Sequence, residues 1–353
     1  MGVEAGGRIR ASDLAAKTGF FNCAIPDMPP LEHSQLSPAL TQSYRGFPDR
    51  TPRIQSLKGL EYFRNITGLD VSGHQIKELD VSHNTKLKIL ACRYNQLTEL
   101  DLSNNPDLIE LYCGSNQFNS LDLSNNLKLR VLSCQANKLS DLQVNHLKNL
   151  EVLDCSMNYL SNINIDALAA LKVLRVSRNN LTELDITHNS KLYELFIIHN
   201  RLQSLNVSHN PELTVIHCEN NQLTVLDVST LSRLEKLYCS SNQISELDVS
   251  NCSQLQWLSC ISNQLKQIDL SQNLLLTNLE LTDNLLTELP DLRNHLRLEA
   301  LGVDKNYLTC EDAVQLKEIM PRFTGTWAVL GDHVSKGLFY TEQKNDVNLN
   351  NCD

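Results

Sequence analysis

The sequence is poor in aromatic residues and in positive charge. Only 5% of its 353 residues are Phe, Trp or Tyr, which is few for a compact enzyme of this size. Its 31 Lys and Arg are outnumbered by 41 Asp and Glu, which gives a net charge of -10. Because binding to a phosphate backbone depends on many basic contacts, this balance argues against nucleic acid as the partner. No run of 18 apolar residues occurs, so we expect no membrane-spanning helix.

The sequence also lacks the short motifs of the common enzyme and metal-binding families. It contains no G-x-S-x-G, G-x-x-x-x-G-K-[ST], G-x-G-x-x-G or H-E-x-x-H segment. Neither a C-x-x-C pair nor a D-x-D-x-D-G calcium loop is present. The ten histidines are scattered and form no acid–base pair. We therefore expect no catalysis, no cofactor and no bound metal.

What the sequence does have is a period of 21 residues, which is clearest in its cysteines. Seven of the eleven fall on this period: Cys92, Cys113, Cys134, Cys155, Cys218, Cys239 and Cys260. The two positions that interrupt the series carry Val176 and Ile197. Since free cysteine behaves as a small buried hydrophobe, we interpret this column as a core position with reduced thiols. Disulfides within the column are disfavoured, because Cβ atoms on adjacent parallel strands lie about 4.8 Å apart.

A column of asparagines follows the cysteine column three residues later. Its members are Asn95, Asn116, Asn137, Asn158, Asn179, Asn200, Asn221, Asn242, Asn263, Asn284 and, after a one-residue slip, Asn306. The unit reads L-x-x-L-x-C-x-x-N-x-L-x-x-L-D-L-S, which is typical of a leucine-rich-repeat solenoid. The pattern predicts a β-rich α/β solenoid: a right-handed leucine-rich-repeat horseshoe of about twelve turns, with one short parallel strand per turn on the concave face.

The unit also predicts where its side chains point. Leu90 and Cys92 alternate along a strand and should face the core, and the amide of Asn95 should bond backbone groups of adjacent turns. A further inward column alternates between Asn and Leu or Cys, as in Asn84, Asn105, Leu147 and Cys252. A column of aspartates precedes Ser or Thr by two residues: Asp80, Asp101, Asp122, Asp185, Asp227, Asp248 and Asp269. We expect these carboxylates to accept backbone N–H groups in the turn, and calcium binding is the alternative.

The apolar core is exposed at both ends of a repeat array and requires capping segments there. Residues 1–56 precede the repeats and are interpreted as a partly disordered N-terminal cap or leader, with an export signal or a partner-binding arm as the alternative. Residues 57–306 form the solenoid, and residues 307–353 form a C-terminal cap helix and tail. Thr309 and Asp312 can cap this helix, whose apolar residues are Ala313, Val314, Leu316, Ile319 and Met320. A disulfide between Cys310 and Cys352 is geometrically possible.

The unit from Leu87 to Leu97 resembles the short bacterial repeats of the internalin J type, which carry a cysteine ladder beside an asparagine ladder. The segment from Leu57 to Asp70 is similar to the first repeat of such proteins. The resemblance implies a surface-displayed or secreted adhesin or interaction module in contact between bacterium and host. Met1–Lys17 lacks the apolar stretch of a cleavable signal peptide. A cytoplasmic location and export by a dedicated secretion system are therefore the two alternatives.

Large side chains occupy the outward strand positions of the later turns, which predicts a binding face. We expect the protein to be a monomer. We expect these side chains to form one patch: Arg175, Arg178, Phe196, Ile198, His217, Glu219, Tyr238, Trp257 and Ile261. An aromatic centre with a polar rim is typical of a protein–protein hot spot. The sequence thus predicts a non-catalytic module that binds a partner protein on its concave face. An adhesin or secreted effector that recognises a host protein or a glycan is the alternative.

Overall fold

The computed structural model describes residues 18–22 and 57–319, and the chain divides into two compact units, Met1–Leu142 and Gln143–Asp353. The first unit contains β1 (Thr18–Asn22), a 3-10 helix η2 (Leu60–Tyr62), β2 (Asn65–Asp70), β3 (Ile89–Ala91), β4 (Glu110–Tyr112) and β5 (Val131–Ser133). The second contains β6 (Val152–Asp154), β7 (Val173–Arg175), β8 (Glu194–Phe196), β9 (Val215–His217), β10 (Lys236–Tyr238), β11 (Trp257–Ser259), β12 (Asn278–Glu280), β13 (Ala300–Gly302) and α2 (Cys310–Ile319).

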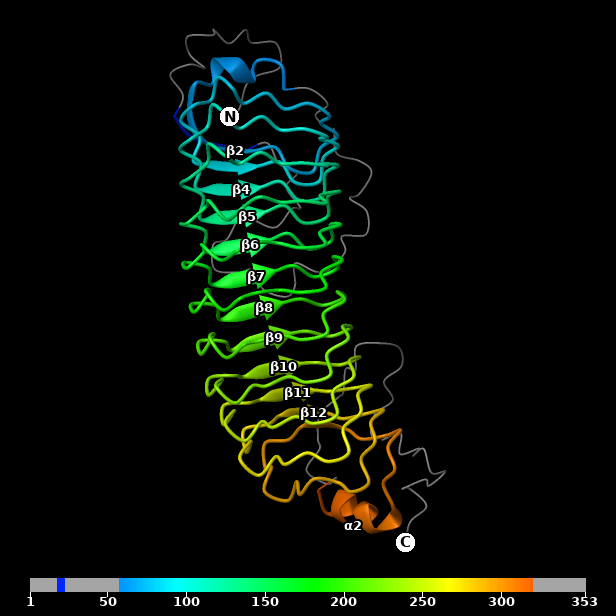
Figure 1. Ribbon diagram of the computed structural model, residues 1–353. Coiled ribbons are helices and arrows are strands. Elements are labelled where there is room, and N and C mark those ends of the chain that lie inside the picture. Colours follow the sequence, from blue (N-terminus) through cyan, green and yellow to red (C-terminus); the bar gives the residue numbers. More distant parts are fainter. Residues whose placement is uncertain (1–17, 23–56, 320–353) are drawn as a thin grey trace. The chain divides into compact units, whose positions relative to one another are not determined.

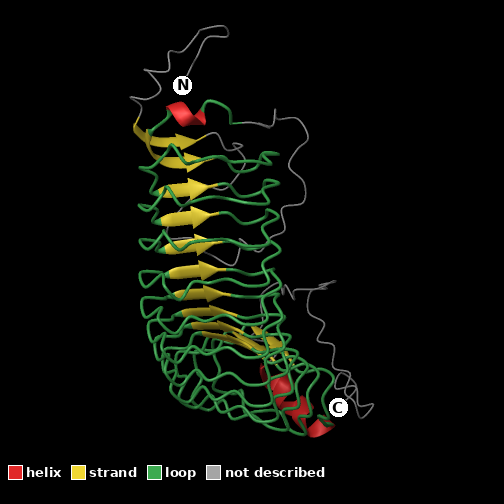
Figure 2. Cartoon of the chain, turned by 45° about the horizontal axis from the view of Figure 1, so that its top comes forward, coloured by secondary structure: helices red, strands yellow, loops and turns green. Residues whose placement is uncertain are grey.

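Each unit is a parallel-strand solenoid, as the repeat predicts. In the second unit, the strands lie one after another along the stack (Figure 1), and the rest of each turn returns through loop segments (Figure 2). Partners in the sheet are equivalent repeat positions, such as Leu237 beside Leu258. The one-residue slip of the sequence also appears, because Leu279 of β12 pairs with Leu301 of β13. This register aligns every repeat column along the stack.

The first unit contains one strand that the repeat pattern did not predict. β1 runs parallel to β2, with an irregularity between Gly19 and Phe20. It therefore gives β2 a hydrogen-bonded neighbour on the side facing away from β3.

The core of both units consists of the predicted inward columns. Leu87, Leu90, Cys92 and Leu97 of one turn are all fully buried. All seven cysteines of the 21-residue column, together with Cys252, are free and buried. Val176 and Ile197 are as buried as the cysteines. The interpretation of the cysteine column as core is therefore confirmed.

The asparagine column holds consecutive turns together through backbone hydrogen bonds. The Asn116 Nδ2 donates to the carbonyls of Cys92 (2.9 Å) and Cys113 (3.1 Å), and its Oδ1 accepts the N–H of Leu97 (3.0 Å). Equivalent bonds recur along the column, for example at Asn200. Each amide thus satisfies buried backbone groups on two turns, which is the predicted role.

The two remaining polar columns also form hydrogen bonds with backbone groups. In the inward column, Asn105 Nδ2 donates to the carbonyls of Val81 and Asn84 at 3.2 and 3.0 Å. Throughout the aspartate column, Oδ1 accepts the N–H two residues later at 2.8–2.9 Å. The Ser103 side chain and backbone lower the pKa of Asp101 by hydrogen bonding to its carboxylate. The aspartates therefore act as turn acceptors, as expected.

The helix α2 covers the last turn of the second unit. Its cap is the predicted one, since the Thr309 N–H donates to the Asp312 carboxylate at 2.9 Å. The other Asp312 oxygen accepts the N–H of Leu289 at 2.8 Å, and the side chain of Gln315 accepts that of Leu292 at 2.6 Å. Ala313, Leu316 and Ile319 are buried, as predicted.

Two further details concern this end of the chain. Val314 is 56% exposed, unlike the other described apolar residues of α2. Successive residues of an α-helix are about 100° apart around its axis, so Val314 points away from the direction of Ala313. The helix contacts the last turn through the face that carries Asp312 and Gln315. Cys310 is disulfide-bonded. Met320 and Cys352 lie outside the described residues.

Within the described ranges, no helix is both long enough and apolar enough to span a bilayer.

Candidate functional site

The candidate site is the row of residues that end the strands of the second unit. Parallel register places one such residue per turn in a line: Arg175, Phe196, His217, Tyr238, Ser259, Glu280 and Gly302. Adjacent strands are about 4.8 Å apart, which suits face-to-face contact between planar side chains. We call the surface formed by these residues and their outward-facing strand neighbours the strand face.

Four aromatic side chains form a continuous stack on the strand face. The rings of Phe196 and His217 lie 4.7 Å apart, and those of His217 and Tyr238 lie 4.1 Å apart; both pairs are nearly parallel, with interplanar angles of 11°. The Trp257 ring continues the series at 5.7 Å from Tyr238, tilted by 37°. We refer to Phe196, His217, Tyr238 and Trp257 as the aromatic stack.

A positive charge covers the Phe196 end of the aromatic stack. The Arg175 guanidinium lies 4.7 Å from the Phe196 ring centroid, which is cation–π geometry. The same group forms an ion pair with Glu194 at 2.8 Å. Burial raises the pKa of Glu194, and the nearby Arg175, His217 and Lys236 oppose this shift. This end of the stack therefore already holds an arginine between an aromatic ring and a carboxylate.

Two carboxylates lie near the other end of the stack. Glu219 Oε1 lies 3.1 Å from His217 Nδ1, and the Ser259 hydroxyl donates to Glu280 at 2.7 Å. Burial raises the pKa of Tyr238 to about 12, and Glu219 and Glu280 add to this shift. Both carboxylates therefore lie close enough to the Tyr238 hydroxyl to disfavour its ionisation.

The structure brings six of the nine predicted face residues into direct contact with one another: Arg175, Phe196, His217, Glu219, Tyr238 and Trp257. Ile198 and Ile261 are half-buried two residues beyond the strand ends of their turns. Arg178 is exposed at a turn position with φ of 55°.

The sequence prediction omitted two features of the strand face. Glu194 and Glu280, which lie near the two ends of the stack, were not among the predicted face residues. Phe196 is only 6% exposed, because Arg175 and His217 cover its two faces. It therefore contributes to packing as well as to the surface.

A smaller cluster of the same kind lies on the first unit. The Arg93 guanidinium is 5.2 Å from the Tyr112 ring, and the Tyr112 hydroxyl donates to Glu110 at 3.0 Å. Burial raises the pKa of Tyr112. Tyr112 is 8% exposed, so this cluster offers less aromatic surface than the stack of the second unit.

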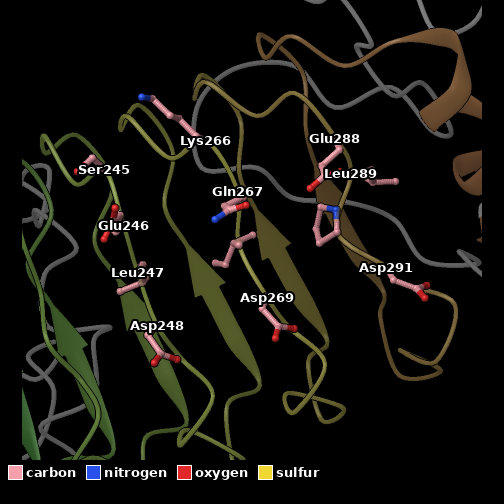
Figure 3. A pocket seen from close by; sticks show the side chains of 12 residues that line it. Ser245, Glu246, Leu247, Asp248, Lys266, Gln267, Asp269, Glu288, Leu289 and Asp291 are labelled. Carbon is pink, nitrogen blue, oxygen red and sulfur yellow. The ribbon is translucent and has the colours of Figure 1, made fainter.

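A shallow groove of about 670 Å³ crosses three returning segments of the second unit (Figure 3). It is lined by Ser245–Asp248, Lys266–Asp269 and Glu288–Asp291. Leu247, Ile268 and Leu289 are 7–8% exposed, so the surface available to a ligand is mostly polar and acidic. Asp248 and Asp269 already accept turn hydrogen bonds, which leaves the groove fewer groups to offer a ligand.

One group of possible metal ligands occurs in the part of the chain that the structure describes. Ligand atoms of Asp166, Asp185 and His188 lie within 4.8 Å of one another, and all three side chains are exposed. Asp185 Oδ1 also accepts the backbone N–H and the hydroxyl of Thr187. Exposed acidic groups of this kind are common without a metal, so the strand face remains the better candidate site.

Comparison with known proteins agrees with the repeat fold. The family model of two leucine-rich-repeat copies matches residues 211–252. The functional domain of InlJ from Listeria monocytogenes, which includes a cysteine ladder, is 31% identical with a TM-score of 0.60. That match covers 72% of this chain and 66% of the InlJ chain, so this chain spans just under two thirds of that protein.

Two further solved structures share the fold. The internalin InlF from Listeria monocytogenes is 26% identical, with a TM-score of 0.68 over 73% of this chain and 80% of that one. The leucine-rich-repeat protein LIC12759 from Leptospira interrogans is 24% identical, with a TM-score of 0.67 over 74% and 72% of the two chains. No curated protein matches the sequence significantly.

Proposed function

Because this chain is a leucine-rich-repeat protein with cysteine-ladder units like those of bacterial internalins, we propose that it is a non-catalytic module that binds a partner protein on the strand face of its second unit. The aromatic stack is the observation that carries this proposal. The rings of His217, Tyr238 and Trp257, on consecutive turns, are partly exposed, and polar groups surround them. Such a composition is typical of interface hot spots.

The scaffold supports binding by a preorganised surface. Each ring sits on a strand whose position is held by the sheet and by asparagine hydrogen bonds such as those of Asn221. Stacking further limits the rotamers of His217 and Tyr238. A partner therefore has little side-chain ordering to induce, which favours affinity. By the same resemblance to internalins, the partner we propose is a host protein contacted by a bacterium.

Capture of partners from host and bacterial lysates tests the proposal with two double variants. Tyr238→Ala with Trp257→Ala removes two half-buried rings from the strand face. Tyr159→Ala with Tyr193→Ala is the matched control, because these rings are exposed by 60% and 41% and take no part in the stack. We expect a specific partner to be lost only with the first variant. Equal capture by both variants would show that the strand face is not the binding site.

A further inference from the structure

The two ends of the aromatic stack are unequal in charge. At the Phe196 end, Arg175 lies on a ring and is neutralised by Glu194. At the Trp257 end, the carboxylates are bound to hydroxyls: Ser259 donates to Glu280, Ser262 to Asp283 and Thr282 to Asp304, at 2.7, 2.9 and 2.7 Å. Among the described residues, no lysine or arginine forms an ion pair with Glu280 or Asp304.

Within the row of strand ends, Glu280 has small neighbours on both sides. They are Ser259 on β11 and Gly302 on β13. The row therefore changes after Tyr238 from large planar side chains to small ones. Glu280 and Trp257 both remain partly exposed beside this step. Trp257 pairs with Asn278, two residues before Glu280 on β12, so a partner side chain can approach the carboxylate and the indole together.

We infer that the Trp257 end is a binding site for an arginine of the partner, carried on a segment that lies along the strand face. This inference rests on the proposed function. The incoming guanidinium stacks on Trp257 and pairs with Glu280, as Arg175 stacks on Phe196 and pairs with Glu194 at the other end. Arginine suits the site better than lysine, because its planar group stacks on an aromatic ring and binds a carboxylate with two N–H groups.

The surrounding charge favours the same partner. On the strand face of the turns of β11 to β13, the described charged residues are Glu280, Asp283, Asp304 and Lys305, whereas the exposed Lys266, Arg293 and Arg297 belong to the returning segments. Lys236 on β10 lies instead near Glu194, where it acts on the pKa of that carboxylate. A basic segment is therefore attracted to the Trp257 end and oriented along the strand face.

Selection of displayed random 12-residue peptides on the intact chain tests the inference. We expect selected peptides to contain arginine and to lose about tenfold in affinity when that arginine is replaced by citrulline, which keeps the planar shape without the charge. Glu280→Gln should cause a similar loss. In the Glu280→Gln variant, replacing the peptide arginine with citrulline should cause little further loss of affinity. That non-additivity would show that the arginine and Glu280 interact directly.

A matched variant controls for net charge. Glu246→Gln with Glu288→Gln removes two exposed carboxylates from the groove of Figure 3 and should leave peptide affinity unchanged. Peptides without arginine, failure to select any peptide, or full affinity of Glu280→Gln would each overturn the inference. The proposed function would survive those results if lysate capture still depended on Tyr238 and Trp257, because that experiment assumes no particular charge in the partner.

Discussion

The imidazole of His217 lies 4.1 Å from the ring of Tyr238 and nearly parallel to it. On its other face, the same imidazole lies 4.7 Å from Phe196. His217 is therefore enclosed between two rings, at separations that follow from the spacing of parallel strands. The strand face thus owes its order to the same repeat that builds the core.

Replacing His217 with Ala should destabilise the second unit. Each aromatic pair contributes about 0.5–1.5 kcal/mol beyond buried area, so the loss of two pairs should cost about 1–3 kcal/mol. His217→Phe keeps both stacking contacts and should cost less. Urea unfolding followed by circular dichroism measures the difference. His209→Ala, at an exposed histidine, is the control, and an equal loss in that variant would contradict a special role of the stack.

Replacing Asn221 with Ala should also destabilise the second unit. Its side chain donates to the carbonyls of Ile197 and Cys218 and accepts the N–H of Leu202, all at 3.0–3.1 Å in the interior. Removal leaves the buried N–H of Leu202 without its acceptor and takes one hydrogen bond from each of two carbonyls, which still accept from Asn200 and Asn242. One unsatisfied donor and two lost hydrogen bonds should together lower the free energy of unfolding by about 3 kcal/mol. Asn221→Asp should not restore stability, because a carboxylate cannot donate to the two carbonyls.

The adjacent exposed residue provides the control for this prediction. Gln222→Ala changes a solvated side chain in the same turn and keeps the backbone hydrogen bond to Leu202. Its urea midpoint should stay close to that of the parent chain. A loss similar to that of Asn221→Ala would mean that the turn, and not the asparagine amide, is the sensitive element.

The core columns could be predicted from the sequence because a fixed period gives equivalent residues equivalent surroundings. Exchange of cysteine for Val176 and Ile197 identified a buried position, and the common Asn column identified a backbone partner. The clustering of Phe196, His217, Tyr238 and Trp257 followed from the same register. These features depend only on which residues share a column.

Features that depend on side-chain direction were not predicted. The pairing of Arg175 with Glu194 joins different columns on adjacent turns, and the burial of Phe196 results from its two neighbours. The residue before each ladder asparagine has φ near 55°, a conformation that most residues avoid. Residues as different as Met157 and Lys305 occupy this position, so the residue type does not reveal the positive φ angle. Gly73, with φ of 82°, gives the one visible signal in the first repeat.

His295 should make the second unit sensitive to acid. The residue is 2% exposed, and its Nε2 lies 3.1 Å from the carbonyl oxygen of Leu270. Burial lowers its pKa below the ordinary value of 6.5, while the Leu270 carbonyl and Asp291 oppose the shift. The unfolded chain therefore binds a proton at a higher pH than the folded chain. The contribution of His295 to the free energy of unfolding is therefore complete above about pH 6.5, the pKa in the unfolded chain. It decreases as the pH falls from that value to the lower pKa of the folded chain.

His295→Asn tests this effect, because Asn273 occupies the equivalent place in the preceding turn and donates to two carbonyls there. Urea unfolding between pH 7.5 and 5.5 should show a smaller loss of stability in the variant than in the parent chain. His209→Asn, at an exposed histidine, should keep the parent's pH dependence. Parallel pH profiles for His295→Asn and the parent would exclude His295 as the source of acid sensitivity.

The eight cysteines that are free within the described ranges should resist alkylation in the folded chain. All are buried, and burial raises the pKa of Cys92 to about 12 and that of Cys252 to about 11. Since iodoacetamide reacts with the thiolate, both the lack of access and the raised pKa slow the reaction. Peptide mapping by mass spectrometry after labelling at pH 8.5 should find these sites unmodified until guanidinium unfolds the chain. Val225→Cys places a thiol at a position that is 65% exposed and should label at once. Rapid native labelling of any cysteine in the 21-residue column would contradict its assignment to a closed core.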